Sequence, residues 1–148
     1  MHPPGQFCGQ IHASCVARDG AGVLLLGPPG AGKSDLVLRL LDHGFSLLAD
    51  DRVEIADGMA RPPAGLEGLL EVRGFGIVRL PHAGQARLAL AVDLAGAAVR
   101  LPAPAREPRF CLPLVAVDPA LPSAAARIAL ALDCALGCVR QVAGAFAA

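Results

Sequence analysis

The chain has 148 residues, the length of one domain with a single core, and its formal net charge is zero. It contains no basic cluster, so a nucleic acid is not an expected partner. No apolar run approaches the roughly 20 residues that a membrane-spanning helix needs. The first residues, Met1-His2-Pro3-Pro4-Gly5, lack the charged and apolar regions of a signal peptide. We therefore expect a cytoplasmic protein with no membrane partner.

The start of the chain predicts a loose arm over residues 1–9, followed by a strand over residues 10–17 that contains His12. Arg18-Asp19-Gly20-Ala21-Gly22 then predicts a hairpin turn into a second strand, residues 22–26. A histidine on a strand is usually structural. Because the neighbouring strand leads into a glycine-rich loop, a functional role for His12 is equally open.

That loop is Gly27-Pro28-Pro29-Gly30-Ala31-Gly32-Lys33-Ser34, which fits the pattern G-x-x-x-x-G-K-[ST] between a buried strand and a helix. In such a loop, backbone N–H groups point at phosphate oxygens and the start of the helix adds a positive dipole end. Lys33 would contact the β- and γ-phosphates, and the hydroxyl of Ser34 would complete a Mg²⁺ shell. The sequence therefore predicts that the chain binds ATP or another nucleoside triphosphate.

The helix after the loop is expected to run to about His43, where Gly44 can adopt a left-handed cap. A strand over residues 45–49 follows and ends in Asp50-Asp51. An apolar strand that ends in a carboxylate is typical of the site that faces the loop's Mg²⁺. Two adjacent side chains point in opposite directions from an extended backbone, so one carboxylate would reach metal or substrate and the other would pair elsewhere. A solvated turn is the alternative.

Beyond a short strand at residues 53–55, a turn at 56–59 and a proline-containing loop at 61–65, the segment 69–78 stands out. Its Gly74 and Gly76 permit sharp bends or close approach to a ligand. Glu71 and Arg73 would share a face if the segment were extended, either in a site or as a surface ion pair.

The remaining elements complete an α/β fold. Residues 87–94 alternate as a strand with Leu88, Leu90 and Val92 on one face, residues 99–113 contain four prolines and read as loop or edge, and residues 114–117 form a last strand. A C-terminal helix is predicted from Ser123, as N-cap, to about residue 142. We expect one phosphate-loop domain, residues 10–148, with a mixed sheet, a helix after the loop and a C-terminal helix.

The five cysteines are Cys8, Cys15, Cys111, Cys134 and Cys138, with no C-x-x-C pair among them. Cys134 and Cys138 lie one helical turn apart, which leaves a two-ligand zinc site open. Small buried hydrophobic side chains are the interpretation that we prefer.

Several of these segments together resemble the catalytic domain of HPr kinase/phosphorylase. They are Ile11-His12-Ala13-Ser14, the phosphate loop, Leu48-Ala49-Asp50-Asp51-Arg52-Val53-Glu54 and Leu69-Leu70-Glu71-Val72-Arg73-Gly74-Phe75-Gly76-Ile77-Val78. The last is similar to that family's signature, L-E-[VI]-R-G-[LF]-G, which is far more specific than a phosphate loop alone. The tail Leu112-Pro113-Leu114-Val115-Ala116-Val117-Asp118-Pro119 matches a family loop more weakly.

The resemblance implies transfer of phosphate from ATP, or in some members pyrophosphate, to a serine of the phosphocarrier HPr, with possible reversal by phosphorolysis. It implies active-site roles for His12, Lys33, Asp50 and Asp51, and Mg²⁺ ligation by Ser34 and Glu71. The family's base falls in the Asp-Asp pair, and its spacing from Ser34 favours Asp51 over Asp50. A homo-oligomer, hexameric in the family, is also implied.

The chain departs from the family pattern in three places. The family's separate N-terminal domain is expected to be missing. The family's flexible loop with a catalytic arginine is short here, with Arg100, Arg106 and Arg109 as candidates outside any motif. The loop before the last helix has Asp118-Pro119 in place of basic residues. Kinase activity is therefore expected before phosphorylase activity, and a small-molecule kinase or a nucleotide-binding regulatory module are the alternatives.

Overall fold

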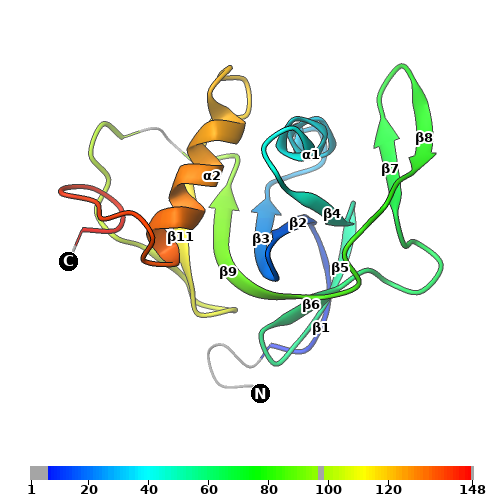
Figure 1. Ribbon diagram of the computed structural model, residues 1–148, viewed down its shortest axis with the longest axis horizontal. Coiled ribbons are helices and arrows are strands. Elements are labelled where there is room, and N and C mark those ends of the chain that lie inside the picture. Colours follow the sequence, from blue (N-terminus) through cyan, green and yellow to red (C-terminus); the bar gives the residue numbers. More distant parts are fainter. Residues whose placement is uncertain (1–6, 97–98, 148) are drawn as a thin grey trace.

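A mixed β-sheet with two helices forms the centre of the molecule (Figure 1), which a computed structural model describes for residues 7–96 and 99–147. The strands are β1 (Gly9–His12), β2 (Ser14–Arg18), β3 (Ala21–Leu26), β4 (Ser46–Ala49), β5 (Arg52–Ala56), β6 (Met59–Arg61), β7 (Leu69–Val72), β8 (Gly76–Arg79), β9 (Ala86–Asp93), β10 (Arg106–Glu107) and β11 (Leu112–Ala116). The helices are α1 (Lys33–Leu41) and α2 (Ala124–Ala135). The predicted mixed α/β fold is thus confirmed.

Three parallel strands set the position of the site. The main sheet has the order β1-β5-β6-β9-β3-β2-β4, and β11 pairs with the second half of β9. Strands β3, β9 and β11 run parallel. Strand β2 is antiparallel to both β3 and β4, so β4 runs in the same direction as β3. The carboxyl ends of β3, β9 and β11 therefore lie at one edge, which is where open α/β sheets bind their ligands.

The sheet has a hydrophobic core on each face. Leu25 and Val92 point to the side of α1 and α2, where Leu36 and Ile128 pack against them. On the opposite face, Leu24 and Ala91 pack against side chains of β5 and of the segment before β11. Figure 1 shows β1, β5 and β6 at the bottom of the view and the two helices above. The outer strands thus cover the face that the helices leave open.

A β-bulge in β9 corrects one prediction. Gly22 of β3 lies opposite Leu88, but the next residue, Val23, lies opposite Leu90, so Ala89 is an extra residue. An extra residue in one strand reverses the faces of all residues beyond it. Leu88 therefore packs in the core away from the helices, whereas Leu90 packs in the core beneath them. The prediction that Leu88 and Leu90 share a face was wrong.

The N-terminal strand also differs from the prediction. Residues 10–17 form two strands that separate at Ala13, because β1 pairs with β5 and β2 pairs with β3 and β4. Residues 1–6 of the predicted arm lie outside the described residues. The arm is shorter than predicted, since β1 begins at Gly9 and the ring of Phe7 packs edge-on against Phe110 with centroids 5.3 Å apart.

The predicted turns are confirmed because their residues adopt the left-handed backbone that such turns need. Asp19 and Gly20 join β2 to β3 with φ values of 51° and 80°, and Asp57 and Gly58 join β5 to β6 with values of 52° and 76°. Both pairs fit two-residue hairpin loops. Residues 69–78 form the separate hairpin of β7 and β8, which turns at residues 73–75.

The ends of the two helices were predicted less accurately than the turns. α1 begins at Lys33, ends at Leu41 and is followed by Gly44 with φ of 84°, as expected for a left-handed cap. α2 ends at Ala135, well before residue 142, and Ser123 makes no side-chain capping bond, because its Oγ accepts from Nε of Arg127 instead.

No helix in the described part of the chain has the length and apolar character to cross a membrane.

The cysteines are free thiols in different surroundings. Cys134 is half-buried and Cys138 is exposed, so the prediction that both are buried was wrong for Cys138. Cys15 is fully buried in the core, and this burial raises the pKa of its thiol to about 12. Cys15 therefore acts as a small hydrophobic side chain.

Gly68 lies at the base of the β7–β8 hairpin, and its replacement is predicted to destabilise the protein. Its φ is 73°, and an added Cβ would lie 2.6 Å from the carbonyl oxygen of Leu80. Gly68→Ala should lower the free energy of unfolding by about 1–3 kcal/mol from backbone strain, with a further loss from the overlap. Gly65→Ala is the matched control, since φ is 87° there but no atom lies within 4 Å. Urea unfolding of both variants tests this, and equal midpoints would contradict it.

Candidate functional site

The glycine-rich loop between β3 and α1 closes over its own lysine. Gly30 and Gly32 have φ values of 83° and 95°, which let the backbone curl. Nζ of Lys33 donates to the carbonyl oxygens of Gly27 at 2.7 Å and Pro28 at 3.0 Å. Lys33 is the only lysine in the sequence and is 7% exposed. The loop therefore places one sequestered ammonium group at the start of α1.

Lys33 carries a perturbed pKa. Burial lowers the pKa of its ammonium group, and the charges of Asp51 and Asp50 act in the opposite direction. A partly desolvated cation interacts more strongly with an arriving anion than a hydrated one does. The position at a helix N-terminus favours negative charge as well. The loop is thus suited to bind phosphate oxygens.

Asp50 joins three elements to the loop. Oγ of Ser34 on α1 donates to its Oδ1 and Oδ2 at 2.9 and 3.0 Å, and Oγ of Ser14 on β2 donates to Oδ1 at 2.8 Å. The backbone N–H of Glu71 on β7 donates to Oδ2 at 3.4 Å. Both oxygens of this carboxylate are therefore engaged.

Asp51 points elsewhere and is left accessible. Its φ is 70°, a left-handed conformation that aspartate tolerates better than most residues. Its Oδ1 lies 2.7 Å from Nε2 of His12, and the two side chains are 65% and 40% exposed. The two carboxylates thus have different partners, and the chain turns at Asp51 instead of staying extended as the prediction assumed.

The candidate metal ligands Ser34 and Glu71 both contact Asp50, Ser34 through its Oγ and Glu71 through its backbone N–H. Among residues 7–96 and 99–147, no group of three or more His, Cys, Asp or Glu side chains is placed to hold a metal ion. Mg²⁺ fits such a site, because it uses one or two carboxylates and takes its other ligands from water and substrate phosphates. The oxygen donors of Ser34, Asp50 and Glu71 match this chemistry.

The three candidates for a catalytic arginine, Arg100, Arg106 and Arg109, do not lie together at the loop of residues 27–34. Arg109 pairs with Glu107 and lies over the ring of Phe110, and Arg106 donates to the carbonyl of Cys111. Arg100 lines a separate cavity. Glu71 and Arg73 form no ion pair in the described part of the chain. The turn at residues 73–75 explains this, since Arg73 lies beyond the end of β7.

Sequence reasoning missed two residues that build the site. Ser14 is fully buried, yet its hydroxyl fixes Asp50; the available signal was a polar residue inside an apolar strand. Arg39 of α1 donates to the carbonyl oxygens of Pro119 at 2.6 Å and Leu121 at 3.3 Å. It ties the loop before α2 to the phosphate-loop helix.

Comparison with known proteins finds a matching family model and a solved structure with a similar fold. The family model described as HPr Serine kinase C-terminal domain matches residues 8–87, more than half of the chain. The solved structure of the Hpr(Ser) kinase/phosphatase from Coxiella burnetii is similar with a TM-score of 0.71 and 22% sequence identity. The similarity covers 88% of this chain and 92% of that one, and shows a shared fold.

The loop geometry predicts the behaviour of a Lys33 variant. Lys33→Ala should weaken binding of inorganic tripolyphosphate about 10–100-fold, as expected for loss of a hydrogen bond to a charged group. Isothermal titration measures this directly. Arg87→Ala, which removes an exposed cation at the far end of β9, should bind like wild type. An unchanged dissociation constant for Lys33→Ala would contradict the phosphate site.

Proposed function

The chain belongs to the HPr serine kinase C-terminal domain family, and on that premise we propose that it is an ATP-dependent protein-serine kinase. Its acceptor would be a serine of an HPr-like phosphocarrier protein. The observation that carries the proposal is an accessible carboxylate, Asp51, held by His12 beside a loop suited to phosphate.

Asp51 is the better base of the aspartate pair. A general base needs an oxygen that an incoming hydroxyl group can reach. Asp50 accepts from Ser14, Ser34 and the N–H of Glu71, whereas Asp51 is 65% exposed and has His12 as its one described side-chain partner. This geometry supports Asp51 over Asp50 as the base, which is the preference that the spacing from Ser34 gave. His12 would orient the carboxylate of Asp51.

In the proposed reaction, Asp51 accepts the proton of the acceptor serine while the serine oxygen forms a bond to the γ-phosphorus of ATP. The bond from that phosphorus to the bridging oxygen breaks, and ADP leaves. Lys33 and the loop N–H groups stabilise the negative charge on the phosphate oxygens. When bound, Mg²⁺ would be held by Ser34 and Glu71 and would neutralise phosphate charge. The main contribution of these residues is therefore to position the acceptor serine and the phosphate group for transfer.

The reverse reaction and the assembly are part of the proposal. In phosphorolysis, an oxygen of inorganic phosphate would form a bond to the phosphoserine phosphorus, the bond from that phosphorus to the serine oxygen would break, and pyrophosphate would leave. Asp51 would return its proton to the serine oxygen. We also propose a homo-oligomer, hexameric as the family resemblance implies. The apolar side chains of Phe75 and Ile77, 80% and 71% exposed on the β7–β8 hairpin, are consistent with a protein contact.

Transfer of label from γ-labelled ATP tests the function. We expect labelling of an HPr-like carrier but not of a carrier whose acceptor serine is replaced by alanine. Lys33→Ala enzyme is the negative control. A parallel incubation with a metabolite extract identifies a small-molecule kinase. Nucleotide binding without transfer to either acceptor would instead indicate a regulatory module.

The aspartate pair gives a prediction about turnover. Asp51→Asn keeps the size of the side chain but cannot accept the serine proton, so turnover should fall about 10²–10⁴-fold, while ATP affinity changes little. Asp50→Asn should instead disturb the contacts to Ser14 and Ser34 and shift the Mg²⁺ dependence. Turnover at saturating ATP across a Mg²⁺ series separates the two. Near-normal rates for Asp51→Asn would refute its role as base.

Glu71 gives a prediction about the metal. Glu71→Gln should raise the Mg²⁺ concentration for half-maximal rate, because a neutral amide is a poorer ligand for a hard cation than a carboxylate. Glu54→Gln, which alters an exposed carboxylate on β5, is the control. If Glu71→Gln and Glu54→Gln show the same Mg²⁺ dependence as wild type, Glu71 is not a ligand.

A further inference from the structure

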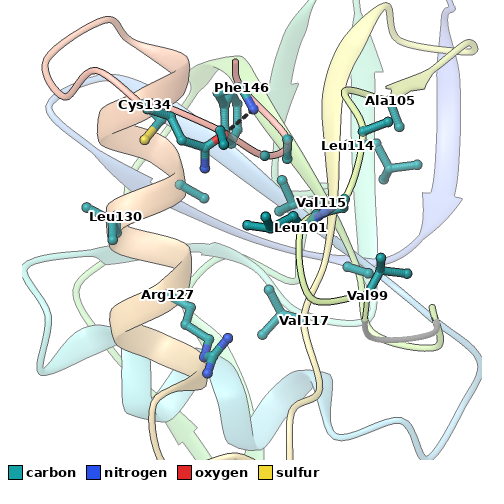
Figure 2. A pocket seen from close by; sticks show the side chains of 18 of the residues that line it. Val99, Leu101, Ala105, Leu114, Val115, Val117, Arg127, Leu130, Cys134 and Phe146 are labelled. Atoms are coloured by element: carbon teal, nitrogen blue, oxygen red, sulfur yellow. Dashed lines mark hydrogen bonds between the residues drawn. The ribbon is translucent and has the colours of Figure 1, made fainter.

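The aspartate pair at residues 50 and 51 is held from within the sheet, not from a hollow in the surface. A cavity of about 610 Å³ opens between α2, β11 and the C-terminal segment 139–146, and Asp93 and Asp118 line it at the end of the parallel strands. Figure 2 shows Val117 on one side of this cavity and Arg127 of α2 on the other. Among the described residues its lining begins at Asp93, so it includes neither aspartate of the pair nor any residue bonded to them.

Ser14 faces Asp50 because one antiparallel register continues through the junction of four strands. The β1–β5 pair ends at His12, and the β2–β4 pair begins at Cys15 in the same register. The residues between them therefore stay opposite their partners on the other chain, which places Ser14 opposite Asp50. Opposed side chains of an antiparallel pair lie close together on one face.

The backbone turns sharply at Asp51 instead of continuing as a strand. The N–H of Arg52 donates to the carbonyl oxygen of Asp50 at 2.8 Å, and φ of Asp51 between them is 70°. A bond across three residues with a positive central φ is the rare, strained form of the γ-turn. In a regular strand Asp51 would point to the buried face of Ala13, whereas in this turn its Oδ1 reaches Nε2 of His12 at 2.7 Å. The turn therefore makes the carboxylate of Asp51 accessible.

The hydroxyl group of Ser14 bonds to two groups of this turn. Its Oγ donates to Oδ1 of Asp50 at 2.8 Å and accepts from the N–H of Asp51 at the longer distance of 3.5 Å. On the other side of Asp51, its carbonyl oxygen accepts from the N–H of Ala13 at 3.2 Å. A strained backbone persists only where the surrounding structure holds it. Ser14 and Ala13 supply such contacts to both peptide groups of Asp51.

The burial of Ser14 shows that these bonds account for its hydroxyl group. In the described part of the chain, Ser14 and Lys33 are the only polar or charged residues that are buried. The neighbours of Ser14 on the strand, Ala13 and Cys15, are fully buried as well. A buried hydroxyl group costs free energy unless it is hydrogen-bonded. Packing alone would be satisfied by alanine at position 14, so the polar group is explained by the two aspartates.

We propose that Ser14 is a positioning residue for phosphate transfer, which holds the turn at residues 50–52 so that the carboxylate of Asp51 faces the acceptor serine. Because Ser14 is fully buried, it acts through Asp51 and not on the substrate. This inference rests on the proposed function, in which Asp51 is the base. It extends the site to a side chain beneath its surface.

Removal of the hydroxyl group tests this role by kinetics. Ser14→Ala should lower kcat about 10–100-fold, because a small misplacement of a catalytic group costs rate of this order, and should leave KM for ATP within about twofold of wild type. Turnover is measured with an HPr-like carrier at saturating ATP across a Mg²⁺ series. Cys15→Ala is the control and should keep the wild-type kcat, since Cys15 is equally buried on β2 but its thiol contacts the carbonyl oxygen of Val16.

The Asp51→Asn background distinguishes positioning from a general loss of structure. Where residue 51 cannot act as a base, its exact position matters little, so Ser14→Ala should lower the residual kcat less than about threefold. An unchanged kcat in Ser14→Ala, or an equal fold loss in both backgrounds, would overturn the inference. Recovery of the rate at raised Mg²⁺ would also overturn it, because the effect would then lie at the metal site.

Amide hydrogen exchange tests the hold on the turn in the free protein. In Ser14→Ala, the amides of Ala13 and Arg52 should exchange at least about tenfold faster than in wild type, whereas those of β3 should be unchanged. Unchanged exchange at both amides would overturn the inference even if turnover fell. If wild type transfers no phosphate to the carrier, the proposed function fails, and faster exchange would still show that Ser14 holds the turn.

Discussion

The carboxylate of Asp50 is the constraint on which the site depends. It accepts hydrogen bonds from β2, α1 and β7 through Ser14, Ser34 and the N–H of Glu71. These elements are separated in sequence, and the β7–β8 hairpin is not paired with the main sheet. A charged acceptor at the meeting point gives each donor a strong partner. These contacts engage both oxygens of Asp50, whereas the side chain of Asp51 is 65% exposed, so one aspartate provides structure and its neighbour remains accessible.

The direction of the strands extends this local arrangement to the whole molecule. Because β3, β9 and β11 are parallel, the phosphate loop, Asp93 and Asp118 reach the same edge although they lie far apart in the chain. Arg39 then links α1 to the segment that leads into α2. Helix α2 is joined to the main sheet as well, because Arg18 of β2 pairs with Asp133 of α2. The cavity and the loop are thereby parts of one framework.

Local signals allowed much of this to be predicted from sequence. The loop between a strand and a helix at residues 27–34 and the Asp-Gly turns were predicted correctly, because glycine and aspartate at those positions have few alternative uses. The break at Ala13 and the bulge at Ala89 were missed, since both depend on which distant strand becomes the partner. The role of Ser14 was missed for the same reason, because its acceptor lies 36 residues away. The cavity could not be foreseen, as its walls come from segments without a motif.

The boundary of the family match has an evolutionary consequence. Residues 8–87 contain His12, the phosphate loop, the aspartate pair and Glu71, whereas every residue that lines the cavity lies at or beyond Asp93. The residues of the proposed transfer site and those that shape the cavity thus lie in consecutive, non-overlapping stretches of the chain. Substitutions in the second stretch can change the shape of the cavity without altering the residues of the proposed transfer site. Such a chain can change this cavity in small steps, each of which leaves the proposed transfer site intact.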